Sequence, residues 1–230
     1  MDVFEAIVKR RSIKKYKRKD IPFDNVATCV HAARFAPCAG NIFNLRFLVI
    51  KSESQRKAIS EACMEQYWMQ DAPIHLVVVS ETQKTEQYYG LRGGRVYTLH
   101  NAAAACENVL LAATSLGLGS CWVGAFNEDK IKDICNVPPH LDVQMIITLG
   151  YADEHPAMPP KRTLEDTLNF GNWYGRIEPP KTGIGDWAPY VEHIVDETKK
   201  AVKHHTKKAS DKIKETFGKK KKENGHHPKR

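Results

Sequence analysis

The most apolar stretch of the chain, residues 102–126, constrains the fold more than any other feature. Two polar residues, Glu107 and Asn108, interrupt this stretch, and two glycines break it before its end. A membrane-spanning helix needs about 20 consecutive, predominantly apolar residues, so these interruptions argue against a transmembrane segment. We therefore predict a long buried helix over residues 98–116, rich in Ala and Leu, followed by a buried strand at 121–124.

Three further apolar runs have the length of buried strands, at residues 47–50, 75–79 and 143–149. Helical patterns lie around them: a first helix capped by Asp2, a second from Pro22 to the residues before Ala36-Pro37, and others over 53–65 and 128–134. This mixed order of helices and strands predicts an α+β or α/β sandwich.

The positive charge of the chain is concentrated at its C-terminal end. Residues 191–230 hold 13 Lys/Arg and 6 Asp/Glu, a net charge of +7, whereas the rest holds 22 and 21, a net charge of +1. We predict a globular domain over 1–178, a Pro/Gly linker over 179–190, a basic amphipathic helix over 191–217 and a disordered Lys/His-rich tail over 218–230.

The N-terminus has neither the basic region nor the apolar core of a signal peptide. The six cysteines stand far apart with no CxxC pair, which favours neither a metal site nor a redox dithiol. We expect a cytoplasmic protein with reduced thiols and no metal.

Four segments, taken together in this order and spacing, resemble the FMN-dependent nitroreductase family over roughly the first 165 residues. They are Arg10-Arg11-Ser12, Ala36-Pro37-Cys38-Ala39-Gly40-Asn41, Gly117-Leu118-Gly119-Ser120-Cys121-Trp122-Val123-Gly124 and Leu149-Gly150-Tyr151-Ala152. The resemblance implies an α/β/α sandwich with a central, mostly antiparallel sheet flanked by helices. It also implies a domain-intertwined homodimer and makes residues 1–178 the FMN-binding domain.

The resemblance assigns the FMN phosphate and ribityl chain to Arg10, Arg11, Ser12 and Lys14. Guanidinium groups match phosphate geometry because they donate two parallel hydrogen bonds, and a hydroxyl adds a third. Arg162 is the corresponding basic residue late in the domain. Taken without the other segments, these residues would be an exposed basic stretch and a solvated linker charge.

The loop after the second helix is expected to contact the flavin from the partner subunit, through Pro37, Cys38, Ala39 and Asn41. Small side chains let the backbone approach a flat ring, and an asparagine offers both a donor and an acceptor. The family usually has serine where Cys38 stands and often has glutamine where Phe43 stands. A plain helix-ending turn is the alternative interpretation.

Trp122, Val123 and Gly124 are expected to present backbone beside the reactive face of the flavin. The alternative interpretation is a core strand with a buried Trp122. The polar stretch that contains Tyr88, Tyr89, Arg92 and Arg95 stands where the family places its variable, substrate-covering segment.

The implied activity is an NAD(P)H-dependent FMN oxidoreductase with a ping-pong mechanism. NADH or NADPH would reduce the flavin by hydride transfer to N5, and a small nitroaromatic, quinone or flavin-like acceptor would then take the electrons. No side chain is assigned a catalytic role, because the flavin performs the chemistry. A glycine-rich GxGxxG motif after a strand is absent from the sequence, so the sequence does not favour a Rossmann site for the nicotinamide.

Two alternatives remain open at this point. One is a specialised flavin enzyme of the same fold, of the dehalogenase or flavin-cleaving type. The other is a non-catalytic FMN-binding protein that docks to an anionic surface, a membrane or a nucleic acid, through its basic C-terminal tail.

Overall fold

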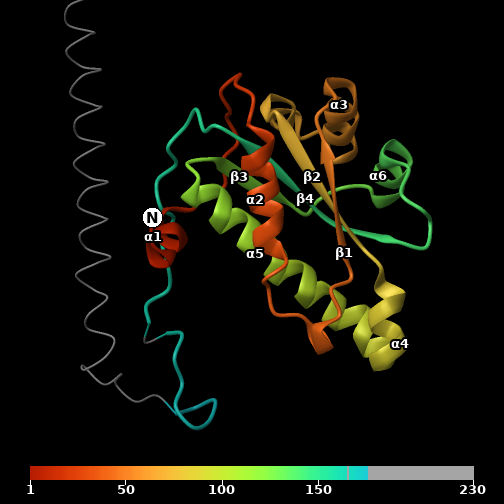
Figure 1. Cartoon of the computed structure of the whole chain (residues 1–230). Coiled ribbons are helices and arrows are strands. Elements are labelled where there is room, and N and C mark those ends of the chain that lie inside the picture. The colour runs from red at the N-terminus through yellow and green to blue at the C-terminus, as the bar shows by residue number, and fades with distance from the viewer. Residues whose placement is uncertain (165, 176–230) are drawn as a thin grey trace, which may run out of the picture. The chain divides into compact units, whose positions relative to one another are not determined.

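The computed structural model describes residues 1–164 and 166–175 and divides the chain after Pro159 into two compact units. All helices and strands described below belong to the first unit, Met1–Pro159 (Figure 1). The predicted linker 179–190, helix 191–217 and tail 218–230 lie outside the described residues, so those boundaries stay predictions.

A four-stranded antiparallel sheet organises the first unit. Its strands are β1 (Leu45–Ile50), β2 (Ile74–Ser80), β3 (Gly119–Val123) and β4 (Asp142–Gly150), and their order in the sheet is β1-β2-β4-β3. All three pairings are antiparallel, and a bulge interrupts the β2–β4 pairing between Val78 and Val79. The predicted antiparallel sheet is confirmed.

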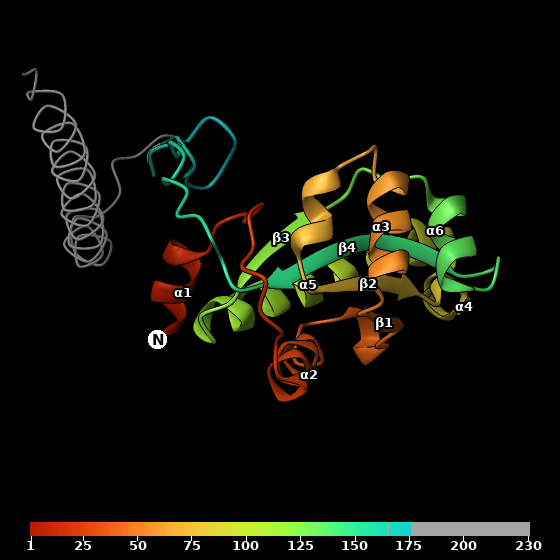
Figure 2. The same cartoon turned by 90° about the horizontal axis from the view of Figure 1, so that it is seen from above.

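Helices cover both faces of this sheet, which makes the α/β/α sandwich expected from the sequence (Figure 2). On one face lie α2 (Phe23–Ala33) and α5 (Thr98–Ser115), and on the other lie α3 (Glu53–Ala62) and α6 (Glu128–Cys135). Two hydrophobic clusters fill the spaces between the sheet and these two helix layers.

Strand β2 shows how the sheet separates the two clusters. Leu76 and Val78 pack into the cluster beneath α2 and α5, whereas Val77 and Val79 pack into the cluster beneath α3 and α6. Successive side chains of a strand point to opposite faces, so a central strand between two helix layers is buried on both faces and mostly apolar. All seven residues of β2 are buried.

The remaining elements are short or carry no clear sequence pattern. They are α1 (Val3–Lys9), the 3₁₀ turns η1 (Ala39–Asn41) and η2 (Tyr67–Asp71), α4 (Thr82–Arg92) and the π-helical turn η3 (Gly93–Tyr97) that leads into α5. Among the helices of the described residues, none combines the length and the apolar composition that a membrane span requires.

Two sequence predictions differ from the observed elements. The sequence pattern extends α3 to residue 65, but the helix ends at Ala62 because Met64 and Glu65 take left-handed φ angles of 56° and 57°. The polar stretch Thr82–Arg92, for which no helix is predicted, is helical. Its single buried residue is Thr85, so it lacks the apolar stripe that predicts a helix.

Candidate functional site

The segment from Arg10 to Lys14 passes along the start of β3. The backbone N–H of Ile13 donates to the carbonyl oxygen of Ser120 at 3.0 Å, and Ser12 forms an isolated parallel bridge with Ser120. Ile13 is buried, whereas Ser12 and Lys14 on either side are exposed. This alternation is that of an extended strand, so two of the predicted phosphate ligands project from one side of the segment.

The side chain of Arg10 reaches from the end of α1 to the middle of α5. Its Nε lies 3.3 Å from Glu107 Oε1, and the two side chains are 31% and 45% exposed. A half-exposed ion pair adds little to stability, but it sets the direction of the guanidinium. The pair engages Nε, and the guanidinium carries four further N–H donors for another anion.

Arg11 is held more firmly, and one of its donors is buried without a partner. Its Nη1 donates to the carbonyl oxygens of Val8 at 2.6 Å and Arg10 at 2.7 Å. Its Nε is buried and has no hydrogen-bond partner among the described residues, and the same holds for the hydroxyl of the nearby Ser120. Burial lowers the pKa of the Arg11 guanidinium, and the charge of Arg10 lowers it further.

A buried polar group without a hydrogen-bond partner destabilises the folded state by about 1–3 kcal/mol. An anion with several acceptor oxygens would satisfy the Arg11 donor and offset the repulsion between the two guanidinium groups. The start of β3 is therefore suited to a phosphate group.

Glu154, beyond the end of β4, fixes the backbone of this segment. Its Oε1 accepts from the N–H groups of Lys14 at 2.5 Å and Lys15 at 3.1 Å. The ammonium group of Lys14 lies 5.6 Å from the centre of the Trp68 ring, within range of a cation–π contact. The backbone of Lys14 is thus pinned while its charged group stays at the surface.

The far end of β3 presents Trp122 and Gly124. Trp122 is 38% exposed between the buried residues Cys121 and Val123. The alternative interpretation is therefore right that β3 is a core strand and wrong that Trp122 is buried. A Cβ atom placed on Gly124 would meet only the Trp122 indole, at 3.6 Å from its Nε1. The backbone here is open to a flat molecule.

The second predicted region, the loop from Pro37 to Asn41, lies beside the start of α5. Gly40 and Asn41 both take left-handed φ angles, 57° and 58°. Glycine and asparagine are the residues that adopt this conformation most readily. The hydroxyl of Tyr89 on α4 lies where a Cβ of Gly40 would stand, so a larger residue at this position would have to displace the Tyr89 side chain as well as adopt the left-handed conformation.

A cavity of about 290 Å³ separates this loop from α5. One of its walls is aromatic: the Tyr97 ring packs edge-on against Tyr89 with 5.3 Å between centroids, and Arg92 Nε donates to the Tyr97 hydroxyl at 3.3 Å. The lining residues are Pro37, Cys38, Ala39, Tyr97, His100, Asn101 and Ala104.

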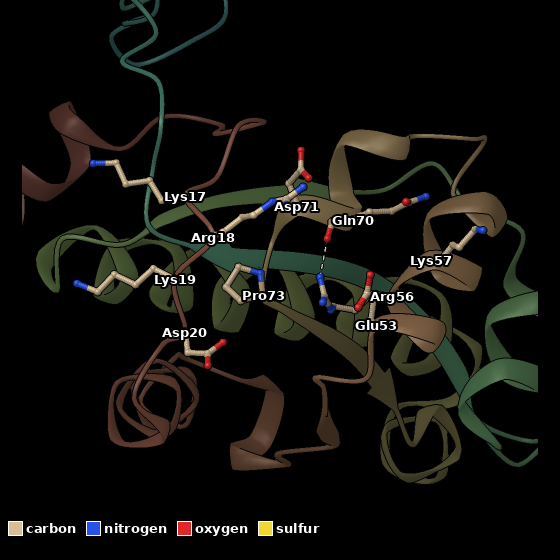
Figure 3. Close-up of a pocket in the computed structure, with 10 residues that line it drawn as sticks. All are labelled: Lys17, Arg18, Lys19, Asp20, Glu53, Arg56, Lys57, Gln70, Asp71 and Pro73. Atoms are coloured by element: carbon tan, nitrogen blue, oxygen red, sulfur yellow. Dashed lines mark hydrogen bonds between the residues drawn. The ribbon is translucent and has the colours of Figure 1, made fainter.

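A larger pocket, of about 540 Å³, lies elsewhere on the first unit and contains none of the predicted residues (Figure 3). It has five cationic and three anionic side chains. Arg56 is already engaged there, because its Nη1 donates to the carbonyl oxygens of Gln70 at 2.5 Å and Ala72 at 2.7 Å. Lys17 and Lys19 extend away from Arg56. This mixed charge does not select for a phosphate.

The predicted site residues of the first unit thus fall into two groups. One group lines β3 and consists of Arg10, Arg11, Ser12, Lys14, Trp122, Val123 and Gly124. The other lies at the start of α5 and consists of Pro37, Cys38, Ala39 and Asn41. Arg162 is exposed in the second unit, and its role stays a prediction.

Several residues that build these groups are not predicted from the sequence: Asn101, Glu107, Glu154 and Tyr97. Asn101 is 4% exposed within the apolar face of α5, and its Oδ1 accepts from the Ala39 N–H at 3.0 Å. A buried polar residue in an apolar helix face is the signal that could have found it. Glu154 has no such signal, because its role depends on chain segments 140 residues apart.

The chain is similar in sequence to known proteins over most of its first unit. The sequence profile of the Nitroreductase family matches residues 7–68 and 64–151. A Methanothermobacter thermautotrophicus protein with the provisional name NADH dehydrogenase/NAD(P)H nitroreductase is 32% identical over 160 residues, 68% of this chain and 80% of that protein.

Solved structures share the fold. A nitroreductase family protein of Clostridium novyi aligns with a TM-score of 0.63 at 29% identity, over 76% of this chain and 97% of that one. An FMN-dependent nitroreductase of Clostridium difficile aligns with a TM-score of 0.64 at 24% identity, over 74% of this chain and 99% of that one. From its sequence, its sheet and its helix layers, this chain belongs to the nitroreductase family.

Proposed function

We propose that this chain is an NAD(P)H-dependent FMN oxidoreductase. The observation that carries the proposal is the unpartnered buried Nε of Arg11, placed beside Arg10, Ser12 and Lys14 at the start of β3. The family membership and the provisional name of the archaeal relative support the same activity. When bound, FMN would supply hydride transfer from NADH or NADPH to a small acceptor.

The residues along β3 fit the parts of FMN in order. Arg10, Arg11 and Lys14 would hold the phosphate dianion, and the exposed hydroxyl of Ser12 would donate to it or to the ribityl chain. The open backbone near Gly124 would lie against the isoalloxazine ring. In this arrangement the protein supplies binding, orientation and exclusion of water, and it needs no catalytic side chain.

We further propose that two subunits complete each site. The loop at the start of α5 would reach the flavin held by the β3 group of the partner subunit. Apolar side chains are exposed along α1 and the start of α5, with Val3 at 68%, Ile7 at 47% and Leu99 at 52%. A homodimer that packs α1 and the start of α5 against the partner subunit would cover these side chains.

The acceptor would be a small flat molecule. The 290 Å³ cavity beside the loop has an aromatic wall, which favours nitroaromatics, quinones or flavins over bulky substrates. The rates of NADH and NADPH oxidation, measured with each of these acceptors, would identify both the acceptor and the preferred donor. An acceptor undergoing dehalogenation or ring cleavage would instead support a specialised enzyme of the same fold.

All six cysteines are free thiols. Free thiols persist in a reducing compartment, so we propose that the protein works in the cytoplasm. Fractionation of cells that express the natural protein would test this location.

The FMN site is tested by substituting Arg11. We expect Arg11→Ala to raise the Kd for FMN about 10-fold or more, because a hydrogen bond to a charged group contributes about 1.5–3 kcal/mol. Flavin fluorescence titration of the FMN-free protein measures this Kd. Arg18→Ala is the matched control, because it removes a nearby cation of the larger pocket and leaves the β3 group unchanged. Equal effects of the two substitutions would refute the assignment.

A further inference from the structure

We propose that Asn101 is a positioning residue of the flavin site, which fixes the backbone of the 37–41 loop through a buried hydrogen-bond network. The inference rests on the proposed function, because it concerns the loop expected to contact the flavin of the partner subunit. Asn101 itself would touch no flavin. It would act by holding the Ala39 N–H and the left-handed turn after it in place.

The network consists of four buried polar side chains from three parts of the chain. Asn44 precedes β1, Thr85 lies in α4, and Thr98 and Asn101 lie in the first turn of α5. Asn44, Thr85 and Thr98 are 0% exposed and Asn101 is 4% exposed. Burying four polar side chains is unfavourable unless they satisfy one another, so their hydrogen bonds are strongly constrained.

The direction of the hydrogen bonds is determined at the loop end. The Ala39 N–H can only donate, so the atom 3.0 Å from it must be the oxygen of the Asn101 amide. Asn101 Nδ2 then donates to Asn44 Oδ1 at 3.3 Å. Asn44 Nδ2 in turn donates to the hydroxyls of Thr85 and Thr98, each at 3.2 Å.

The direction is determined at the other end as well. The Thr98 hydroxyl donates to the carbonyl oxygen of Gly93 at 3.2 Å, and a carbonyl can only accept. The amide orientation of Asn44 and Asn101 therefore agrees with a fixed donor at one end and a fixed acceptor at the other. A substitution that reverses or removes one member leaves buried groups without partners.

The loop depends on this network for its attachment to α5. Its other backbone hydrogen bonds are local, from Asn41 N–H to the Cys38 carbonyl at 3.1 Å and from Ile42 N–H to the Ala39 carbonyl at 3.0 Å. Within residues 1–164, the Ala39–Asn101 bond is the one that joins residues 37–41 to α5. Loss of Asn101 would free the loop without breaking its turn.

Helix α4 is connected to the same hydrogen-bond network. Its Thr85 is a member of the network, and its Tyr89 occupies the space beside Gly40. Asn44 and Asn101 thereby link α4, which stands where the family places its substrate-covering segment, to the 37–41 loop. We expect a change in the position of α4 to alter the position of the loop, and the reverse.

The test compares two asparagines of α5 in the full chain, which is freed of FMN for the titration and then reloaded for the absorbance spectrum. Asn101→Leu removes the loop contact, whereas the control Asn108→Leu removes a similar hydrogen bond, from Nδ2 to the Ala32 carbonyl at 3.1 Å, that touches neither group of the site. We expect Asn101→Leu to raise the Kd for FMN about 10-fold and to shift the visible absorbance bands of the remaining bound flavin. Asn108→Leu is expected to lower thermal stability while leaving both readouts unchanged.

A second variant keeps the proposal testable if Asn101→Leu fails to fold. Thr98→Val preserves volume but removes the hydroxyl at the far end of the network, and we expect a smaller rise in the Kd for FMN, about 3-fold. The proposal is overturned if these variants change the Kd and the absorbance bands no more than Asn108→Leu does. Failure of the unsubstituted protein to bind FMN would instead refute the proposed function.

Discussion

At the scale of single residues, His75 is the buried titratable group with the clearest consequence. It lies in β2 at 0% exposure, and its Nε2 is 2.9 Å from the Met69 carbonyl oxygen. Because a carbonyl only accepts, Nε2 carries the proton, and the buried Nδ1 has no partner in the described part of the chain. Burial lowers the pKa of His75 from 6.5 to about 4, and the charge of Arg56 acts in the same direction.

This lowered pKa predicts that the free energy of unfolding decreases as the pH is lowered. The folded state keeps His75 neutral, so its contribution is complete above pH 6.5 and is lost as the pH falls toward about 4. At pH 5 the loss is about 2 kcal/mol relative to pH 7.5. Urea unfolding at both pH values measures it.

Two variants isolate the contribution of His75 to this pH dependence. His75→Gln should lose less stability on acidification than the natural protein does, whereas His140→Gln, at an exposed position, should lose as much. An unchanged pH dependence in His75→Gln would show that the loss comes from other groups.

At the scale of elements, α6 shows how local sequence starts and stops a helix. Asn127 Oδ1 accepts from the Lys130 N–H at 3.0 Å at the start, and Asn136 takes a left-handed conformation, φ 50°, at the end. Between them the buried Ile131 attaches the helix to the sheet. Asparagine is favoured at both positions, because its side chain caps amide groups and tolerates positive φ.

The cap of α6 leads to a prediction at this scale. We expect Asn127→Ala to lower the free energy of unfolding by about 1 kcal/mol, because a backbone N–H of the first turn loses its acceptor. Asn127→Asp should retain most of the stability, since a carboxylate accepts the same hydrogen bond. Chemical denaturation of the three proteins decides it, and equal losses in both variants would contradict the capping role.

Helix α4 shows the opposite case, since its residues carry no periodic apolar signal. The helix contains Gly90, which takes a φ of 60°, and it buries only Thr85. Contacts with distant residues hold it: Thr85 with Asn44, and Tyr89 with Gly40. Helix α4 therefore forms because of tertiary contacts, and its own sequence does not predict it.

At the scale of the whole molecule, the family match and the compact first unit end at nearly the same place, residue 151 and Pro159. The net charge of +7 lies far beyond them, in residues 191–230. We infer that the first unit binds the flavin without help from the basic C-terminal segment, residues 191–230.

Truncation after Pro189 tests this separation. We expect the shortened protein to retain the proposed FMN binding and the proposed homodimer, and to bind vesicles of anionic lipid more weakly than the full chain does at low salt. Light scattering and flavin absorbance measure the first two properties, and vesicle co-sedimentation measures the third. Loss of the dimer would identify the removed segment as an interface arm.

The sandwich could be predicted from the sequence, because hydrophobic periodicity records which faces of a helix or strand are buried. The predicted strands at 75–79 and 143–149 and the predicted helix at 98–116 agree within two residues with the observed ends. The order of the Arg10–Ser12, Pro37–Asn41 and Gly117–Gly124 segments likewise predicts the family, and the family match confirms it.

Which of these segments lie in contact could not be predicted from the sequence, because it depends on how distant elements pack. Arg10 pairs with Glu107, Lys14 with Glu154, and Ala39 with Asn101, across 62 to 140 residues of chain. Such contacts depend on the sheet order β1-β2-β4-β3 and on the side from which each helix packs. A single sequence records how buried each residue is, but the partner that satisfies a buried polar group is fixed only when distant elements pack together.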